Sequence, residues 1–246
     1  MIAPNQGQID YWNGDMAGRW LDVESQLDEF FQSPLDELLK IANPRSGEHV
    51  LDVGCGTGVS SFEVARQVLS NGHVVGLDIS RSILDRARSY LDATDLSNVS
   101  FLEADGQTYE FEPDQFDLII SRFGIMFFDE PVAAFQNLAR SMRPGGRLVV
   151  VAWSSINDNN PWFSIPRDIA VAKLGPSELA QDPYAPGPFA FGDVERVVGL
   201  LERAGLADVR GSRVELSLAF DDVSGTASKV MTSVGAAARI LRVKNA

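Results

Sequence analysis

Short apolar runs bounded by turn-forming residues alternate along the chain with longer segments in which apolar residues recur at helical spacing. Six of these runs have the length and composition of β-strands: residues 50–53, 74–77, 99–102, 116–120, 148–152 and, after a longer gap, 214–220. Such alternation is typical of successive βα units, in which each helix returns the chain to a parallel strand. The pattern therefore predicts an α/β fold with a mostly parallel sheet.

Four segments that follow these strands each have one apolar face. Their apolar positions are Val59, Phe62, Ala65 and Leu69, then Ile83, Leu84, Ala87 and Leu91, then Val132, Phe135, Leu138 and Met142, and finally Val194, Val197, Val198 and Leu201. Pro131 suits the first position of the third helix, because the first turn of a helix leaves its N–H groups unpaired and proline has none. Residues 144–146, Pro-Gly-Gly, are predicted to end this helix and turn the chain into the next strand.

Length and composition predict one domain over residues 1–246, because 45% hydrophobic residues in a chain of this size can build one sizeable core. No run of about 18 apolar residues could span a membrane, and the first residues lack the basic and apolar pattern of a secretion signal. The one cysteine, Cys55, can form no internal disulfide and no cysteine-rich metal site. We therefore expect a cytoplasmic protein without a metal.

The charge balance limits the partners. The formal net charge is -13, and the lysines and arginines are scattered. Such a surface repels phosphate backbones and anionic membranes, so the composition argues against a nucleic acid or a lipid surface as partner.

A glycine-rich turn follows the first predicted strand. Residues 51–58 read Leu-Asp-Val-Gly-Cys-Gly-Thr-Gly and lead directly into the first helix. Glycines allow positive φ and let backbone amides approach a ligand beside the positive end of a helix. The loop differs from the Gly-x-Gly-x-x-Gly pattern of dinucleotide sites, because Val59 stands where the third glycine would be. Taken alone, it could also be an ordinary strand-to-helix turn.

Carboxylates follow the next two strands. Asp78 ends the second strand, where it could accept hydrogen bonds from both hydroxyls of a ribose or could cap the helix that starts near Ser80. Asp105 and Gly106 follow the third strand and suit the amino group and ring nitrogen of an adenine. Because parallel strands end at the same edge of a sheet, these groups are predicted to form one nucleoside site.

The segments VLDVGCGTG, GLDIS, EADG, FDLIISRFGIMFF and LARSMRPGGRLVV resemble the successive motifs of class I S-adenosylmethionine (SAM)-dependent methyltransferases, in particular small-molecule enzymes of the ubiquinone and menaquinone methyltransferase type. The resemblance covers residues 45–155. It implies a Rossmann-like, doubly wound sheet with helices on both faces, SAM as cofactor and S-adenosylhomocysteine as product. Residues 226–243 are rich in alanine and predict a helix, so we expect either that the family's final antiparallel strand is missing or that the sheet ends differently.

The resemblance also implies the cofactor-binding residues. Gly54, Cys55, Gly56 and Gly58 would line the methionine part of SAM, and Asp52 would support their loop. Asp78 and Ile79 would hold the ribose and flank the adenine. Asp105, Gly106 and Gln107 would take the adenine edge, and Ser121 and Phe123 would close the amino-acid end. Residues 107–109, Gln-Thr-Tyr, depart from the Leu-Pro run that is common in the family at this point.

Two aromatic segments flank this core. Tyr11 and Trp12 are similar to the entrance segment of small-molecule methyltransferases, and aromatic faces attract a sulfonium cation by about 0.5–2 kcal/mol. Trp20 could serve the same lid or only pin a terminal helix to the core.

We therefore divide the domain into a helical lid (residues 1–44), a SAM-binding core (45–153), a substrate-cap insertion (154–191) and a C-terminal helix, strand and tail (192–246). The insertion could instead pack on the sheet or mediate dimerisation.

SAM carries an activated methyl group, so alignment for in-line attack can suffice and no catalytic residue is assigned. His49 and His73 precede strands at the opposite edge of the sheet, whereas Arg122, Phe123 and Phe128 could orient a substrate. The sequence thus predicts methyl transfer to a small apolar or aromatic metabolite and leaves the oligomeric state open, a homodimer included. The alternatives are an NAD(P)-dependent oxidoreductase and a non-catalytic protein with the SAM-binding fold.

Overall fold

The structure, a computed structural model, describes residues 4–158, 160–175, 182–219, 225–235, 237–238 and 240–241. Its centre is a five-stranded sheet with the strand order β3-β2-β1-β4-β5, in which all neighbouring strands are parallel. The strands are β1 (His49–Val53), β2 (His73–Asp78), β3 (Val99–Glu103), β4 (Phe116–Arg122) and β5 (Met142–Val151). The predicted α/β fold with a parallel sheet is confirmed.

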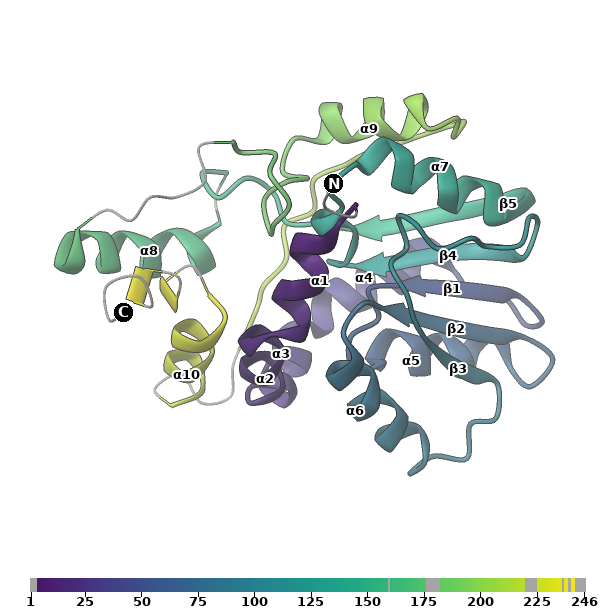
Figure 1. Cartoon of the computed structure of the whole chain (residues 1–246), viewed down its shortest axis with the longest axis horizontal. Helices are drawn as coiled ribbons and strands as arrows, with labels where there is room; N and C mark the ends of the chain where they lie inside the picture. Colours follow the sequence, from purple (N-terminus) through teal and green to yellow (C-terminus); the bar gives the residue numbers. More distant parts are fainter. Residues whose placement is uncertain are drawn as a thin grey trace.

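Helices cover both faces of the sheet (Figure 1). Side chains alternate between the faces along a strand, so Leu51 and Ile119 lie in the core under α7 (Pro131–Ser141) and α9 (Val194–Arg203). Their neighbours Val50 and Leu118 lie in the opposite core, under α4 (Gln32–Ala42) and α5 (Val59–Val68). Because both faces are buried, most positions in the middle of β1, β2 and β4 are apolar on both faces, as is usual in parallel strands.

The predicted helix faces are largely confirmed. Phe62 and Ala65 of α5 are buried, as are Ile83, Leu84 and Ala87 of α6 (Arg81–Leu91) and Phe135 and Leu138 of α7. The prediction for Leu69 was wrong. This residue follows the end of α5 with φ 61° and is 53% exposed, because the helix stops one residue earlier.

β5 begins earlier than the sequence predicts. It starts at Met142, directly after α7, so residues 144–146 lie inside the strand rather than before it. The pairing with β4 is irregular at this point, since Phe116 is opposite Met142 but Leu118 is opposite Arg147. The Pro-Gly-Gly turn thus forms a bulge within the strand.

The predicted sixth strand was wrong where the structure describes it. Residues 211–219 form no strand, and residue 220 lies outside the described ranges. Val214 and Leu216 are 48% and 38% exposed, whereas Leu218 packs against α3 (Glu24–Phe30) and α10 (Thr226–Ser233). The alternating pattern therefore corresponds to an extended chain that runs away from the sheet. The helix predicted over 226–243 is confirmed for α10, which ends at Ser233, and residues 237–238 and 240–241 are helical again after a turn at Val234 and Gly235. The other positions of the predicted helix lie outside the described residues.

The remaining helices gather beside the carboxyl ends of the strands. α1 (Gln6–Asn13), α2 (Asp15–Leu21) and α3 lie next to the sheet, and α8 (Pro161–Leu174) and α10 lie beyond them (Figure 1). The strand order reverses between β1 and β4, and ligands of open α/β sheets bind outside the carboxyl ends at such a reversal. The fold therefore places a ligand site between the sheet and these five helices.

Among the residues that the structure describes, no helix is both long enough and apolar enough to cross a membrane. Nor do three or more metal-ligating side chains converge anywhere in these ranges.

Candidate active site

The backbone of the glycine-rich loop after β1 is hydrogen-bonded to the end of β2. The backbone N–H groups of Gly54 and Cys55 both donate to the carbonyl of Leu77, at 2.8 and 3.0 Å. Gly54 has φ 68°, and a Cβ on it would lie 2.6 Å from the Cα of Gly124, which follows β4. The loops after β1 and β4 thus cross in contact at the point where the strand order reverses. This close approach requires glycine at position 54.

Asp52 braces this loop from inside the protein. Its Oδ2 atom accepts hydrogen bonds from the hydroxyls of Ser60 and Ser61, at 2.6 and 2.7 Å, in the first turn of α5. The side chain is fully buried, and burial raises the pKa of its carboxyl although the two hydroxyls oppose the shift. Asp52 therefore supports the loop and does not reach the cavity beside it.

Asp78, at the end of β2, holds the top of the same loop. Its two carboxylate oxygens accept hydrogen bonds from the backbone N–H groups of Gly56, at 3.0 Å, and Ser80, at 2.9 Å. Burial raises the pKa of Asp78 despite these bonds. The carboxylate contacts the backbone of Ser80, the residue before α6, and it also lines the cavity, so ribose binding by Asp78 stays a prediction.

Asp105 connects the end of β3 to the N-terminal segment. Its Oδ1 atom accepts hydrogen bonds from the side chain of Asn5 and the backbone of Gln107, both at 3.0 Å. Asn5 is 4% exposed, and its own Oδ1 has no hydrogen-bond partner among the described residues. The side chain of Gln107 instead accepts a hydrogen bond from the backbone of Glu130, which directs it toward α7.

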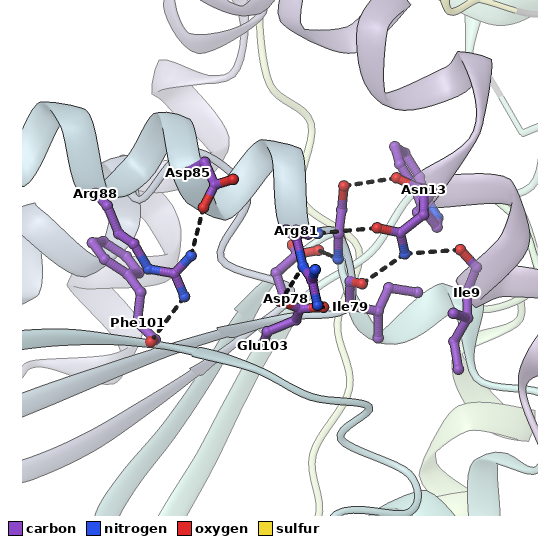
Figure 2. A network of polar contacts seen from close by, with 11 residues as sticks. Ile9, Asn13, Asp78, Ile79, Arg81, Asp85, Arg88, Phe101 and Glu103 are labelled. Atoms are coloured by element: carbon purple, nitrogen blue, oxygen red, sulfur yellow. Dashed lines mark hydrogen bonds and ion pairs between the residues drawn. The ribbon is translucent and has the colours of Figure 1, made fainter.

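Helix α1 is hydrogen-bonded to residues at the end of β2 and at the start of α6 (Figure 2). The Asn13 side chain donates to the carbonyl of Ile79, at 2.8 Å, and accepts from the backbone N–H of Arg81, at 3.1 Å. Ser80 donates its hydroxyl to the carbonyl of Trp12, at 2.6 Å. The end of α1 is therefore held against residues 79–81, which directly follow Asp78.

The crossing of the two loops is completed from β4. The Ser121 hydroxyl donates to the carbonyl of Val53, at 2.7 Å, and accepts from the backbone N–H groups of Gly124 and Ile125. Phe123 has φ 67°, a strained conformation for a side chain other than glycine, and its ring stacks on Trp153 at 4.5 Å between ring centres. In this conformation Phe123 lines the cavity.

One large cavity opens at this end of the sheet. Its lining has a polar part at the strand ends and an aromatic part formed by the surrounding helices and loops. The polar part contains Asn5, Thr57, Ser60, Asp78 and Asp105, and the aromatic part contains Trp12, Trp20, Phe31, Phe123, Phe127, Phe128, Trp153, Trp162 and Phe163. Asp28 and Arg122 form an ion pair on the aromatic side.

The structure brings most of the predicted site residues to this cavity. Those that line it are Trp12, Gly54, Cys55, Gly56, Asp78, Ile79, Asp105, Gly106 and Phe123. Asp52, Gly58, Gln107 and Ser121 lie behind the lining, where they shape the loops. Tyr11 is 43% exposed and contacts the edge of Trp12 from outside.

Sequence reasoning missed Asn5, Asp28 and the ring of Phe127. Asn5 and Asp28 contact partners 100 and 94 residues away in the chain, so no local pattern marks them. Phe127 lies within the FDLIISRFGIMFF segment, and its edge-to-face contact with Trp12 at 5.3 Å joins that segment to α1. The aromatic spacing after β4 was the available signal for Phe127.

A family model described as "Methyltransferase domain" matches residues 44–180. Among curated proteins, the aklanonic acid methyltransferase DauC of Streptomyces sp. (strain C5) is 35% identical over 120 residues, which cover 49% of this chain and 54% of that protein. The demethylmenaquinone methyltransferase of Clavibacter sepedonicus is 35% identical over 125 residues, 49% of each chain. The chain thus spans about half the length of the curated relatives it matches.

Solved structures with the same fold include a SAM-dependent methyltransferase from Aquifex aeolicus, with a TM-score of 0.57 and 20% identity over 77% of this chain and 87% of that chain. Phosphoethanolamine N-methyltransferase 2 from Haemonchus contortus, in complex with phosphomonomethylethanolamine and S-adenosylhomocysteine, has a TM-score of 0.58 and 19% identity over 81% of this chain and 44% of that chain. These structural similarities support the fold. The matched family segment, residues 44–180, contains the loops after β1, β2, β3 and β4 that line the cavity.

Proposed function

The chain belongs to the methyltransferase-domain family, and we propose that it transfers the methyl group of SAM to a small, largely apolar or aromatic molecule. The observation that carries this proposal is the single cavity that joins the polar strand ends of the family's domain to an aromatic chamber. The relatives named after aklanonic acid and demethylmenaquinone support an acceptor of small-molecule size.

The residues at the strand ends fit SAM. Gly56, at φ 58°, has no atom within 4 Å of the position of a Cβ, which leaves a cradle open beside the backbone. The Asp78 carboxylate accepts two backbone N–H groups and keeps lone pairs for two ribose hydroxyls. The unpartnered Oδ1 of Asn5, together with Asp105, offers acceptors for the amino group of an adenine.

The proposed arrangement places the adenosine of SAM at Asp78, Ile79, Asp105 and Gly106, and its methionine part along Gly54, Cys55 and Gly56. Bound SAM supplies an activated methyl group and a good leaving group. The protein residues then orient the acceptor, and the rings around the chamber exclude water during the transfer. Trp12 lines the cavity from α1, and in this proposal its ring faces the positive sulfonium.

Two segments serve as covers in this proposal. Within residues 1–44, α1 lies at the cofactor end, α2 and α3 lie at the aromatic chamber, and α4 packs on the sheet. Residues 154–191 contribute α8, from which Trp162 and Phe163 line the aromatic chamber. The Trp162 and Phe30 rings lie 4.0 Å apart between centres, so the two covers meet over the chamber.

The net charge of -13 favours an uncharged organic acceptor over a nucleic acid. A cytoplasmic location is part of the proposal, because the one cysteine, Cys55, is a buried free thiol that suits a reducing compartment.

Incubation of the protein with isotopically labelled SAM and a metabolite extract tests the proposed activity. We expect label to move to a small organic product and S-adenosylhomocysteine to form in equal amount. A purified protein that binds NADH and not SAM would instead support an oxidoreductase. SAM binding without transfer to any acceptor would support a non-catalytic protein.

A further inference from the structure

The aromatic chamber contains one pair of opposite charges. Four charged side chains line the cavity in the described part of the chain, and two of them, Asp78 and Asp105, stand at the cofactor end. The other two, Asp28 of α3 and Arg122 at the end of β4, lie among the aromatic rings. Ligand pockets fix their ligands through such isolated polar groups in apolar surroundings. The pair is therefore the place where an acceptor could be oriented.

The pair has room for a third partner. Arg122 donates from Nη2 to Oδ1 of Asp28 at 3.3 Å and from Nη1 to the carbonyl of Phe31 at 3.4 Å. The first distance exceeds the 2.7–2.9 Å that is usual between a charged donor and a carboxylate, and the second exceeds the 2.7–3.2 Å that is usual for an N–H donor and a carbonyl. A guanidinium has five N–H donors, and in the described part of the chain Oδ2 of Asp28 accepts no hydrogen bond. One oxygen of a ligand could thus contact both side chains.

The surroundings of Asp28 disfavour the ionised form of its carboxylate. The side chains of Arg122 and Asp28 are 11% and 28% exposed. Burial raises the pKa of Asp28, Arg122 opposes this, and Glu24, one turn earlier on α3, adds to the rise. Glu24 itself is paired with Arg86 at 2.8 Å and with Tyr90, both on α6. Asp28 is accordingly a better proton acceptor than an exposed aspartate.

We propose that Asp28 and Arg122 recognise an acidic hydroxyl, phenolic or enolic, of the methyl acceptor, with Asp28 as the general base and Arg122 as the group that holds the resulting oxyanion. This inference rests on the proposed methyl transfer and adds the acceptor's chemical class. Asp28 takes the hydroxyl proton, and the oxygen forms a bond to the methyl carbon. The carbon–sulfur bond breaks, its electron pair stays on sulfur, and Asp28 later releases its proton to water.

Charge balance favours a neutral hydroxyl as the entering form. The Asp28 and Arg122 pair has no net charge, so a neutral phenol enters the apolar chamber without leaving an unpaired charge. Proton transfer to Asp28 keeps the sum of the charges unchanged. Without the carboxylate, the charge of Arg122 would be unbalanced and would attract the ionised phenolate instead.

The test uses 4-nitrophenol, a phenol that ionises near neutral pH, and its methyl ether 4-nitroanisole. All four tryptophans of the chain, Trp12, Trp20, Trp153 and Trp162, line the cavity, so quenching of their fluorescence reports occupancy. Titrations are made between acid and alkaline pH on the ligand-free protein and on protein with S-adenosylhomocysteine. The variants are Asp28→Asn, which has nearly the same shape, and Glu29→Gln, which removes an exposed carboxylate of the same helix as a control.

We expect the wild-type protein and Glu29→Gln to bind 4-nitrophenol about tenfold more tightly than 4-nitroanisole below the pKa of the phenol, as one hydrogen bond to a charged group provides. Their affinity for 4-nitrophenol falls as the pH rises through that pKa. In Asp28→Asn the sign reverses, and the affinity rises with pH as phenolate forms. A merely structural role of Asp28 would not reverse the sign.

Equal affinity of the wild type for the two probes, or the same pH dependence in Asp28→Asn, would overturn the inference. If Asp28→Asn does not fold, Arg122→Gln serves instead, and it should weaken the preference for the phenol because the guanidinium no longer contacts the hydroxyl oxygen beside Asp28. Calorimetry with S-adenosylhomocysteine distinguishes a failure of the proposed function from a failure of the Asp28 and Arg122 inference. A wild-type protein that does not bind it contradicts the proposed function, whereas binding without phenol selectivity contradicts only the role of Asp28 and Arg122.

Discussion

Replacement of Asp78 by asparagine should separate the affinity for SAM from the stability of the fold. In the proposed complex, the carboxylate accepts two ribose hydroxyls in addition to the N–H groups of Gly56 and Ser80. Asparagine keeps one acceptor oxygen and loses the charge, so about one charged hydrogen bond to the ribose is lost. Such a bond contributes about 1.5–3 kcal/mol, which corresponds to an affinity about 10- to 150-fold weaker.

The same replacement should leave the free energy of unfolding of the ligand-free protein unchanged or raised at neutral pH. Burial raises the pKa of Asp78, so the ionised carboxylate destabilises the folded state above its folded pKa. This cost disappears as the pH falls through the folded pKa toward the unfolded value near 3.8. Asparagine removes the cost at neutral pH and loses one backbone hydrogen bond, about 0.5–1.5 kcal/mol, in exchange.

Calorimetric titration with SAM and urea unfolding between pH 7 and about pH 4 measure both quantities. The difference in stability between the wild type and Asp78→Asn should move in favour of the wild type as the pH falls. Asp85→Asn is the control, because Asp85 is exposed on α6 and pairs with Arg88. A folded Asp78→Asn protein with wild-type affinity for SAM would refute the role of this carboxylate.

Three further replacements test other parts of the site. Gly54→Ala should lower the free energy of unfolding, measured by urea titration, by about 2–5 kcal/mol, because its Cβ would lie 2.6 Å from Gly124 and φ is 68°. Gly56→Ala should lower it by only about 1–2 kcal/mol and still abolish SAM binding. Equal stability losses would contradict this distinction. Asn13→Ala should speed SAM dissociation about 5- to 150-fold and increase hydrogen exchange in residues 6–13, since two hydrogen bonds from α1 are lost. Gln6→Ala is the control and should do neither, because the hydrogen bond of Gln6 stays within α1. Trp162→Ala should reduce methyl transfer but leave the affinity for S-adenosylhomocysteine within about twofold, and unchanged turnover would argue against a cover formed by residues 154–191.

The sequence predicted the parts of the site that depend on local patterns. A strand that ends in a turn marks the carboxyl edge of the sheet, so Asp78 and Asp105 could be placed at neighbouring strand ends without a structure. The contacts of Asp78 with Gly56 and of Asp105 with Asn5 were not predictable. The contact of Asp78 with the backbone of Gly56 depends on how far the loop after β1 folds back over β2.

Residues held by distant partners could not be found in this way. Asn5 reaches Asp105 and Asp28 reaches Arg122 only because the N-terminal helices fold over the strand ends. A single asparagine or aspartate in a helical segment otherwise looks like any solvated residue. Trp12 and Tyr11 show the same limit, because neighbouring positions of one helix face in different directions and only Trp12 lines the cavity.

The last part of the sheet was mispredicted for a related reason. Apolar alternation at 214, 216 and 218 indicates an extended chain but not its partner, and a strand needs a second strand to pair with. Here the apolar contact of Leu218 is with α3 and α10 instead of the edge of β5. Pairing is a property of the whole fold, so the local pattern could not decide it.

The central claim is that the polar half of the cavity binds SAM, and calorimetric titration of the purified wild-type protein tests it most directly. We expect SAM and S-adenosylhomocysteine each to bind at one site per chain, to compete with one another and to raise the unfolding temperature, while NADH produces neither heat nor stabilisation. Binding of NADH in place of SAM, or a folded protein that binds neither SAM nor S-adenosylhomocysteine, would contradict the account.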